Sequence, residues 1–431
     1  MKKIFIITTT VLLANASFGQ VQANSELKGL INQSFGYFPA IKEASNNVVT
    51  AQRKIDIAQI KLPEVNGNAS YEYVKPKIEI PFPMGPNGEL QNFQFAPVHN
   101  GNANVSAEYT LFDFGRIKAD VEKAKSDLQY AKDNVDYNKD QLAYQVANIY
   151  YNIVYIQKAL AIEDSVLTYL NENKRVIESK LKNGDAIKID LLNIQASIDE
   201  DQNRKIDLNN QLQKQLNLLA YTTGSQTATG TSFDFVLPLK DVDGALAEAQ
   251  ANNLEFVLAK DKITQSQRDV DVVKLDDKPK VNLNASTGYK NGYVPNVNEL
   301  RFNYQAGISL KVPIYNGNKT KKQVLLAQST VRQNELHIDA MNNNYKKDIA
   351  QALSDIRTFE TSIQNTVTQI EQTRTAQQIA SSRFMNGTGT NLDITNASGN
   401  YQRALLTQLQ YTYKLCMAKV DLARIMGYRY W

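Results

Sequence analysis

Residues able to support catalysis or metal binding are sparse in this chain. Its 431 residues include two histidines, His99 and His337, and one cysteine, Cys416. Two widely separated histidines are too few for most metal or acid–base sites, and the sequence contains no HExxH, no GxSxG and no glycine-rich phosphate loop. The formal net charge of +4 is close to balance and does not suggest a nucleic-acid binder. We therefore predict that the protein is not an enzyme and has no catalytic residue, no cofactor and no metal site.

Two acidic residues stand out because each follows the same kind of helix-stopping segment. Asp190 lies in KNGDAIKIDLLN, residues 182–193, and Asp393 lies in MNGTGTNLDITN, residues 385–396. Asn-Gly stops a helix because glycine readily adopts the left-handed conformation, and a following Asp or Thr can cap the next helix. Both acids are thus predicted in the first turn after a tight helical hairpin. Stabilisation of the helix dipole is the ordinary role of such an Asp, and a role specific to the hairpin is the alternative.

The first 19 residues predict a secretory signal peptide. Two lysines at positions 2 and 3 precede an apolar run at residues 4–13, and Ser-Phe-Gly at 17–19 is a small-x-small cleavage site. The run is too short for a membrane-spanning helix, and no later apolar run reaches 18 residues. An exported chain with one cysteine has no internal disulfide, so its stability must come from packing or assembly.

The sequence contains an internal repeat. VNGNAS at 65–70 resembles VNLNAS at 281–286, an offset of 216 residues, and the Asn-Gly pairs at 183–184 and 386–387 are 203 residues apart. Chance matches do not keep register over such lengths. We predict a first structural repeat at 20–224, a linker at 225–240 and a second structural repeat at 241–431.

Each repeat contains one segment that predicts a very long helix. Residues 116–183 and 318–386 contain neither glycine nor proline, and a continuous helix of that size would span about 100 Å. Apolar residues from Leu142 to Leu160, and again between Ile349 and Ile370, recur at spacings of three and four, which is typical of coiled-coil packing. Shorter helices are expected at 38–60, 187–221, 243–275 and 391–426, so that two of them laid end to end could accompany a long one.

Four segments alternate apolar and polar residues as strands do, at 65–73, 103–111, 281–289 and 302–312. Their polar positions are mostly Asn, Ser and Gln, and their length suits a tilted strand that crosses a membrane. A water-soluble antiparallel sheet with one wet face is the alternative, but the lack of protective lysine-rich edges favours a transmembrane barrel. We place the strands at about 65–80, 102–112, 280–290 and 301–313. The longer connection at 75–101 is either an extracellular loop or a disordered surface loop.

Four strands are too few to close a barrel. Closed barrels begin at about eight strands, and an open sheet edge in lipid leaves backbone groups unpaired at several kcal/mol each. The chain must therefore share its barrel with copies of itself. The strand pattern alone allows two copies or three.

Taken together, these features resemble the TolC-like outer-membrane efflux protein family, also called the outer-membrane factors. The resemblance rests on the repeat, on TLFDFGR at 110–116 and PIYNGNK at 313–319, and on the two glycine-containing helix tips. It implies an α+β membrane protein with four transmembrane β-strands and long coiled-coil helices in each chain. It further implies a homotrimer whose 12-stranded β-barrel in the outer membrane continues as an α-helical barrel in the periplasm.

The resemblance also implies a function. Members of the family are passive exit ducts of tripartite efflux pumps or type I secretion systems, which work with a periplasmic adaptor (membrane fusion) protein and an inner-membrane pump. The expected partners are therefore two further copies, the adaptor, the pump and outer-membrane lipid, with no nucleic acid. A periplasmic coiled-coil adaptor or a structural surface protein is the alternative, although two hairpins and transmembrane-type strands are not expected of an adaptor. The sequence does not identify the exported substrate.

Site residues follow from the family motif. Asp393 corresponds to an acidic ring that lines the periplasmic aperture, and Asn396 to a second ring position where other members carry an acid. Asp190 corresponds to a residue that helps to lock the aperture, but its partner positions hold Phe384 and Gly389, so the lock must differ. The helix tips expected to contact the adaptor are Asn183, Gly184, Asp185, Ala186, Asn386, Gly387, Thr388 and Gly389.

Overall fold

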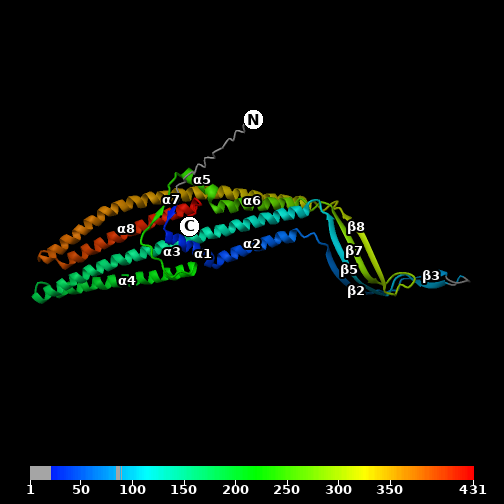
Figure 1. Cartoon of the computed structure of the whole chain (residues 1–431), viewed down its shortest axis with the longest axis horizontal. Coiled ribbons are helices and arrows are strands. Elements are labelled where there is room, and N and C mark those ends of the chain that lie inside the picture. The colour runs from blue at the N-terminus through cyan, green and yellow to red at the C-terminus, as the bar shows by residue number, and fades with distance from the viewer. Residues whose placement is uncertain (1–20, 84–87, 89) are drawn as a thin grey trace, which may run out of the picture. The chain divides into compact units, whose positions relative to one another are not determined.

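The computed structural model describes residues 21–83, 88 and 90–431, so the predicted signal peptide at 1–19 lies outside it. The helices are α1 Ser25–Tyr37, α2 Pro39–Ala58, α3 Arg116–Asn183, α4 Lys188–Thr223, α5 Val242–Asn252, α6 Leu254–Val273, α7 Lys319–Met385 and α8 Asn391–Ile425 (Figure 1). The strands are β1 Gln22–Ala23, β2 Glu64–Tyr73, β3 Glu79–Pro83, β4 Leu90–Gln94, β5 His99–Phe112, β6 Phe235–Val236, β7 Lys280–Lys290 and β8 Arg301–Lys311.

The chain divides into two compact units. Unit 1 comprises the chain up to Asn46, Lys132–Ala259 and His337–Trp431, and unit 2 comprises Asn47–Ala131 and Lys260–Leu336. Each unit draws on both halves of the sequence. The boundaries of the two repeats therefore stay a prediction, since the units do not follow them.

The two long helices occupy the segments that lack glycine and proline, as expected. The helix predicted at 38–60 is confirmed as α2, which follows the unpredicted helix α1, whereas the segment predicted as one helix at 243–275 is broken into α5 and α6. Phe38 is extended between α1 and α2, as suits a residue that precedes proline. Asn253 separates α5 from α6. Its side chain accepts from the backbone of Glu255 and donates to the carbonyl groups of Arg424 and Ile425 at the end of α8, at 3.1 and 2.9 Å.

Both strand-to-helix junctions are capped by the polar residue of their motif. Asp113 accepts from the backbone amides of Gly115 and Ile117, at 3.1 and 2.5 Å, where α3 begins. Asn316 accepts in the same way from the backbone amide of Lys319 at 3.1 Å, where α7 begins. TLFDFGR and PIYNGNK are therefore helix-starting turns, which explains why they share a pattern.

Packing in unit 1 follows the predicted apolar seams for part of their length. In α3, Val146 and Ile153 are fully buried, and they share a core with Ile349 of α7 and Val420 of α8. Farther along α7, Val367 of the predicted seam is 56% exposed in the single chain, so the packing of that part stays a prediction. Cys416 is buried in the same core as a free thiol.

A buried carboxyl group in unit 1 makes stability depend on pH. Asp140 in α3 is only 6% exposed. Burial raises the pKa of Asp140 to about 6, although Arg424 and Arg429 act in the opposite direction. Because the folded pKa lies above the unfolded value, the stability that this group contributes is complete below the unfolded pKa and is lost as pH rises through about 6.

We expect Asp140→Asn to remove this pH dependence. Between about pH 4 and pH 7 the wild type should lose about 3 kcal/mol of unfolding free energy through Asp140, at about 1.36 kcal/mol for each unit of pKa shift. Thermal unfolding followed by circular dichroism across that range measures the loss. Asp199→Asn, in an exposed part of α4, is the matched control. Identical pH profiles for the wild type and Asp140→Asn would contradict the prediction.

Unit 2 contains a four-stranded antiparallel sheet in the order β2-β5-β7-β8. The strand predicted at about 65–80 is present but shorter, because β2 ends at Tyr73 and β3 pairs only with β4 in a separate hairpin. Pro76 lies just past the end of β2, where the missing backbone N–H cannot extend a ladder. The connection at 75–101 therefore contains a hairpin, although residues 84–87 and 89 lie outside the described part.

Candidate functional site

The sheet of unit 2 keeps its polar and apolar sides separate across all four strands. Ser106 of β5 lies opposite Asn66 of β2 and Ser286 of β7, and Ser286 lies opposite Gln305 of β8. Polar positions thus face polar positions at most pairings on this side, and they form one surface. Hydrogen bonds join its side chains, such as that from Asn284 to Ser309 at 2.9 Å.

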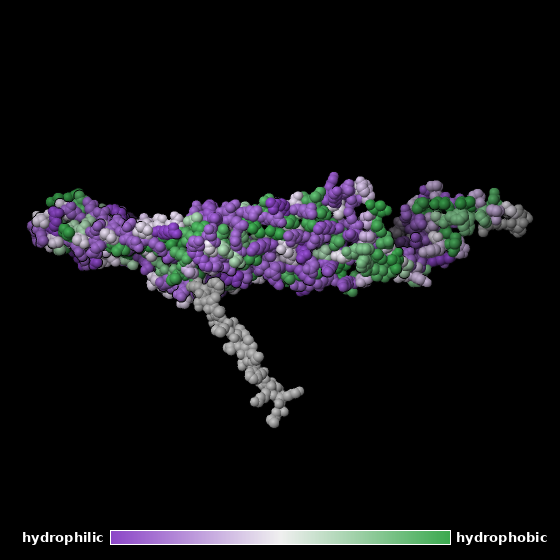
Figure 2. All heavy atoms as spheres, turned by 90° about the horizontal axis from the view of Figure 1, so that it is seen from above, coloured by the Kyte–Doolittle hydropathy of each residue, from purple (hydrophilic) through white to green (hydrophobic). Residues whose placement is uncertain are grey.

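The opposite side of the sheet is apolar and uncovered in the single chain. Tyr304 and Ile308 of β8 are 81% and 70% exposed, and Val65 of β2 and Val105 of β5 are also exposed. Hydrophobic residues gather on the surface over the strands (Figure 2). An apolar face of this extent indicates contact with lipid or with another protein. The arrangement suits a wall with one side toward water and the other toward a membrane.

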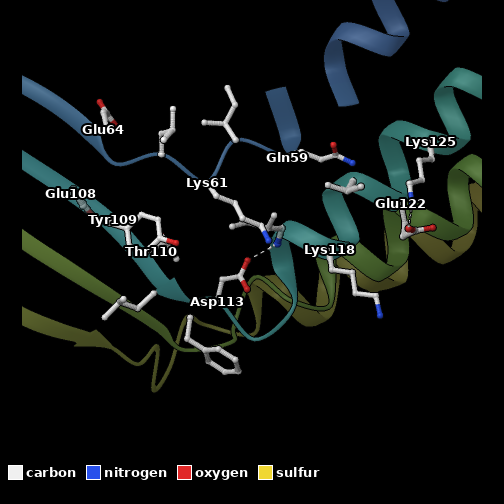
Figure 3. Close-up of a pocket in the computed structure, with 16 residues that line it drawn as sticks. Gln59, Lys61, Glu64, Glu108, Tyr109, Thr110, Asp113, Lys118, Glu122 and Lys125 are labelled. Carbon is white, nitrogen blue, oxygen red and sulfur yellow. Dashed lines mark hydrogen bonds and ion pairs between the residues drawn. The ribbon is translucent and has the colours of Figure 1, made fainter. Parts of the chain in front are cut away.

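Where α3 leaves the sheet, unit 2 has an open groove of about 920 Å³. Figure 3 shows Glu64 and Glu108 on neighbouring strands, with Lys118 and Glu122 on the first turns of α3. Exposed apolar residues before β2, Ile60 and Leu62, complete this part of the lining. The groove could not be predicted from the sequence, because its lining comes from segments about fifty residues apart.

The helix tips belong to unit 1, and each predicted hairpin closes with the same turn. After α3 the backbone amides of Gly184 and Asp185 donate to Leu181 and Lys180, at 3.2 and 2.8 Å. After α7 the amides of Gly387 and Thr388 make the equivalent bonds to Phe384 and Arg383, at 3.1 and 2.9 Å. Gly184 and Gly387 have φ values of 82° and 74°, so both occupy the left-handed conformation that the motif requires. Six of the eight predicted tip residues are exposed, and Ala186 and Gly389 are half-buried.

The two acidic residues that follow the tips, Asp190 and Asp393, both cap helices. The backbone amide of Ile187 donates to Asp190 at 3.2 Å, and that of Thr390 donates to Asp393 at 2.9 Å. Hydrogen bonds from the Thr390 backbone and then its hydroxyl group lower the pKa of Asp393, so its carboxylate is ionised at neutral pH. Asp393 is exposed, and Asn396 is exposed one turn farther along α8. The geometry therefore establishes capping and leaves the charge of Asp393 facing outward.

Contacts between the two hairpins were not predicted. The ammonium group of Lys180 donates to the carbonyl groups of Phe384 and Met385, at 3.0 and 3.3 Å, and lies 5.0 Å from the Phe384 ring centroid. The Asn391 side chain donates to the carbonyl group of Asp190 at 2.9 Å. Lys180 thus caps the end of α7, and Asn391 joins the start of α8 to the first turn of α4. A basic residue in the last turn of α3 was visible in the sequence, but its partner lies about 200 residues away.

Gly389 has a packing role in the same turn. A Cβ atom there would lie 3.0 Å from Cβ of Arg383 and 3.1 Å from the Phe384 backbone nitrogen. Phe384 itself is buried in a small core with Ile177, Ile194 and Ile394. Phe384 and Gly389 therefore hold the tip together by packing.

Paired helical hairpins and an amphipathic antiparallel sheet with two free edges are the features of an outer-membrane channel protein. A family model described as outer membrane efflux protein matches residues 30–225 and 245–428. The chain belongs to that family.

Solved structures share the fold at low sequence identity. VceC from Vibrio cholerae superposes with a TM-score of 0.73 at 17% identity, over 94% of this chain and 97% of that one. The CmeC outer membrane channel of Campylobacter jejuni gives 0.72 at 16% identity, over 94% and 86%. A membrane protein from Pseudomonas aeruginosa gives 0.75 at 15% identity, over 95% and 91%. A comparison with curated protein sequences gives no match. Among the described helices, none is long and apolar enough to cross a membrane.

Proposed function

We propose that three copies of this chain close their sheets into a 12-stranded barrel in the outer membrane, and that their helices continue it as a periplasmic tunnel. The observation that carries the proposal is the sheet, which has a polar face of amides and hydroxyls, an uncovered apolar face and two unpaired edge strands, β2 and β8. Lipid does not tolerate such edges, whereas a ring of copies leaves none. The assembly acts as a passive exit duct, in agreement with the outer-membrane efflux family.

The duct would receive its cargo from an inner-membrane pump through a periplasmic adaptor. The exposed tips, with Gly184 and Gly387 at their turns, are the surface proposed to meet the adaptor. Both an efflux pump and a type I secretion system fit this arrangement. A coiled-coil adaptor or a structural surface protein is the competing function, and the observation that favours it is the length of α3 and α7, which have 68 and 67 residues.

Conductance separates these functions. Purified mature protein added to a planar lipid bilayer should give large, stepwise openings, because an aqueous passage lined by the polar face would connect the two sides. An adaptor or surface protein would give none. Mass measurement in detergent should return three chains, and a lone particle soluble without detergent would overturn the proposal.

We further propose that Asp393, with Asn396 and Asp190 nearby, lines the periplasmic aperture. Three ionised Asp393 side chains around a narrow axis would attract multivalent cations. Asp393→Asn should therefore weaken block of the channel by a trivalent cation, while the amide oxygen keeps the cap on Thr390. Asp199→Asn is the control, because its carboxylate also lies on an exposed helix surface away from the tips. Unchanged block in Asp393→Asn would refute the aperture assignment.

A further inference from the structure

The end of the sheet nearest the helices carries two pairs of like charges. Glu64 of β2 lies opposite Glu108 of β5, and Lys280 of β7 lies opposite Lys311 of β8. Like charges directly opposite each other in a sheet are destabilising. In the described part of the chain the two glutamates accept hydrogen bonds from amides, and neither lysine forms an ion pair. The single chain thus leaves an acidic pair and a basic pair without opposite charges.

These pairs lie at opposite edges of the sheet. Glu64 is on the edge strand β2, and Lys311 is on the other edge strand, β8. Both belong to the polar face, because Glu64 alternates in phase with Asn66, and Lys311 with Ser309. Both also lie at the strand end that adjoins a helix, since β2 follows α2 and β8 precedes α7.

We infer that Lys311 of one copy forms an ion pair with Glu64 of the next copy, where β8 of the first pairs antiparallel with β2 of the second. This inference rests on the proposed ring of copies. In each copy of that ring, β2 runs away from α2 and β8 runs toward α7. An antiparallel junction of β8 with β2 therefore brings the helix ends of the two strands together. The basic pair and the acidic pair lie at those ends. Only shifts by an even number of residues keep polar side chains on one face. Lys311 lies directly opposite Glu64 or one diagonal away, and long side chains span both distances.

Apolar residues at the same end fit the same junction. Past β8 the chain exposes Ile314 and Tyr315, which are 95% and 81% exposed. Before β2 it exposes Ile60 and Leu62, which line the groove of Figure 3 beside Glu64. With Lys311 at Glu64, the segment after β8 is carried past Ile60 and Leu62 of the neighbouring copy. The partner of these exposed apolar residues is therefore a second copy of this chain, and apolar contact accompanies the ion pair.

Cross-linking tests the junction directly. In a Cys416→Ala background, Glu64→Cys combined with Lys311→Cys should react with a short bifunctional thiol reagent to give a covalent ladder that ends at the trimer. Each chain carries both halves of the junction, so the ring can close covalently. Glu72→Cys with Lys311→Cys is the matched control, because position 72 shares the face of Glu64 but lies about 26 Å farther along β2. It should stay monomeric on a denaturing gel.

Charge reversal supplies the second readout. Glu64→Lys and Lys311→Glu, each alone, should lower the temperature at which the assembly dissociates in detergent, and the double variant should restore it. Equal ladders from the two cysteine pairs, or no restoration in the double variant, would overturn the inference while the wild type still assembled and conducted. A ladder that ends at the dimer would support the junction and refute the trimer. A wild type that neither assembles nor conducts would refute the proposed function and with it this inference.

Discussion

Arg204→Met is expected to lower the free energy of unfolding of the paired hairpins by about 3 kcal/mol, the low end of the range for a buried charge that loses its partner. Glu163 of α3 and Asp201 of α4 are almost fully buried, with side chains 1% and 3% exposed. Arg204 pairs with both, at 3.8 Å to Glu163, and the Gln402 side chain of α8 donates to both. Without the guanidinium group, two carboxylates remain buried with one amide between them. The low end of that energy range applies because the Arg204 side chain is itself 40% exposed and its ion pairs are partly screened by water.

The effect should depend on pH in a known direction. Burial already raises the pKa of Glu163, and removal of Arg204 raises it further. Protonation of Glu163 therefore removes a buried charge from the variant. The difference in unfolding free energy between the variant and the wild type should shrink as pH falls from about 7 to 5. Thermal unfolding of the detergent-solubilised protein at both pH values measures this. Lys214→Met, at an exposed position of the same helix, should stay within about 0.5 kcal/mol of the wild type. Equal melting temperatures for Arg204→Met and Lys214→Met would contradict the prediction.

Local chemistry explains which elements could be predicted. The absence of glycine and proline fixed the extent of α3 and α7, because no other residue type breaks a helix so strongly. Asn183-Gly184 and Asn386-Gly387 marked the tips for the same reason. Alternation of single residues marked the strands, and pairing of polar with polar residues then followed from the period of two. Each of these signals is carried by residues a few positions apart.

Long-range contacts explain what could not be predicted. Asn253 breaks a helix by bonding to the end of α8, about 170 residues away. Lys180 caps α7 from α3, across about 200 residues. The buried cluster at Arg204 joins three helices, and nothing local distinguishes the buried Gln402 from Gln408 and Gln410 farther along α8. The charge pairs of the sheet are equally hidden, because Glu64 and Glu108 become neighbours only when β2 and β5 pair.

Gly387→Val is expected to abolish export while the assembly survives. Gly387 has a φ of 74°, and no atom lies within 4 Å of a Cβ atom built on it. A side chain therefore meets no clash, and the cost is the left-handed backbone itself, about 1–2 kcal/mol. A β-branched residue is especially poor in this conformation. The turn should relax and displace Asn386 and Thr388, which we propose meet the adaptor. Each 1.4 kcal/mol of binding free energy lost in this way weakens docking of the adaptor by about tenfold.

Two readouts separate docking from folding. Single-channel conductance and the mass of the purified Gly387→Val protein should match the wild type, whereas export from cells that depend on this duct should fail. Gly399→Val is the matched control, because Gly399 lies inside α8 without a left-handed φ and has open space around it. It should export normally, since valine is no worse than glycine in a helix. Because Gly184 has the same conformation at the other tip, Gly184→Val should reproduce the defect. Loss of the assembly would make these glycines folding residues only, and retained export would remove the tips from the proposed contact with the adaptor.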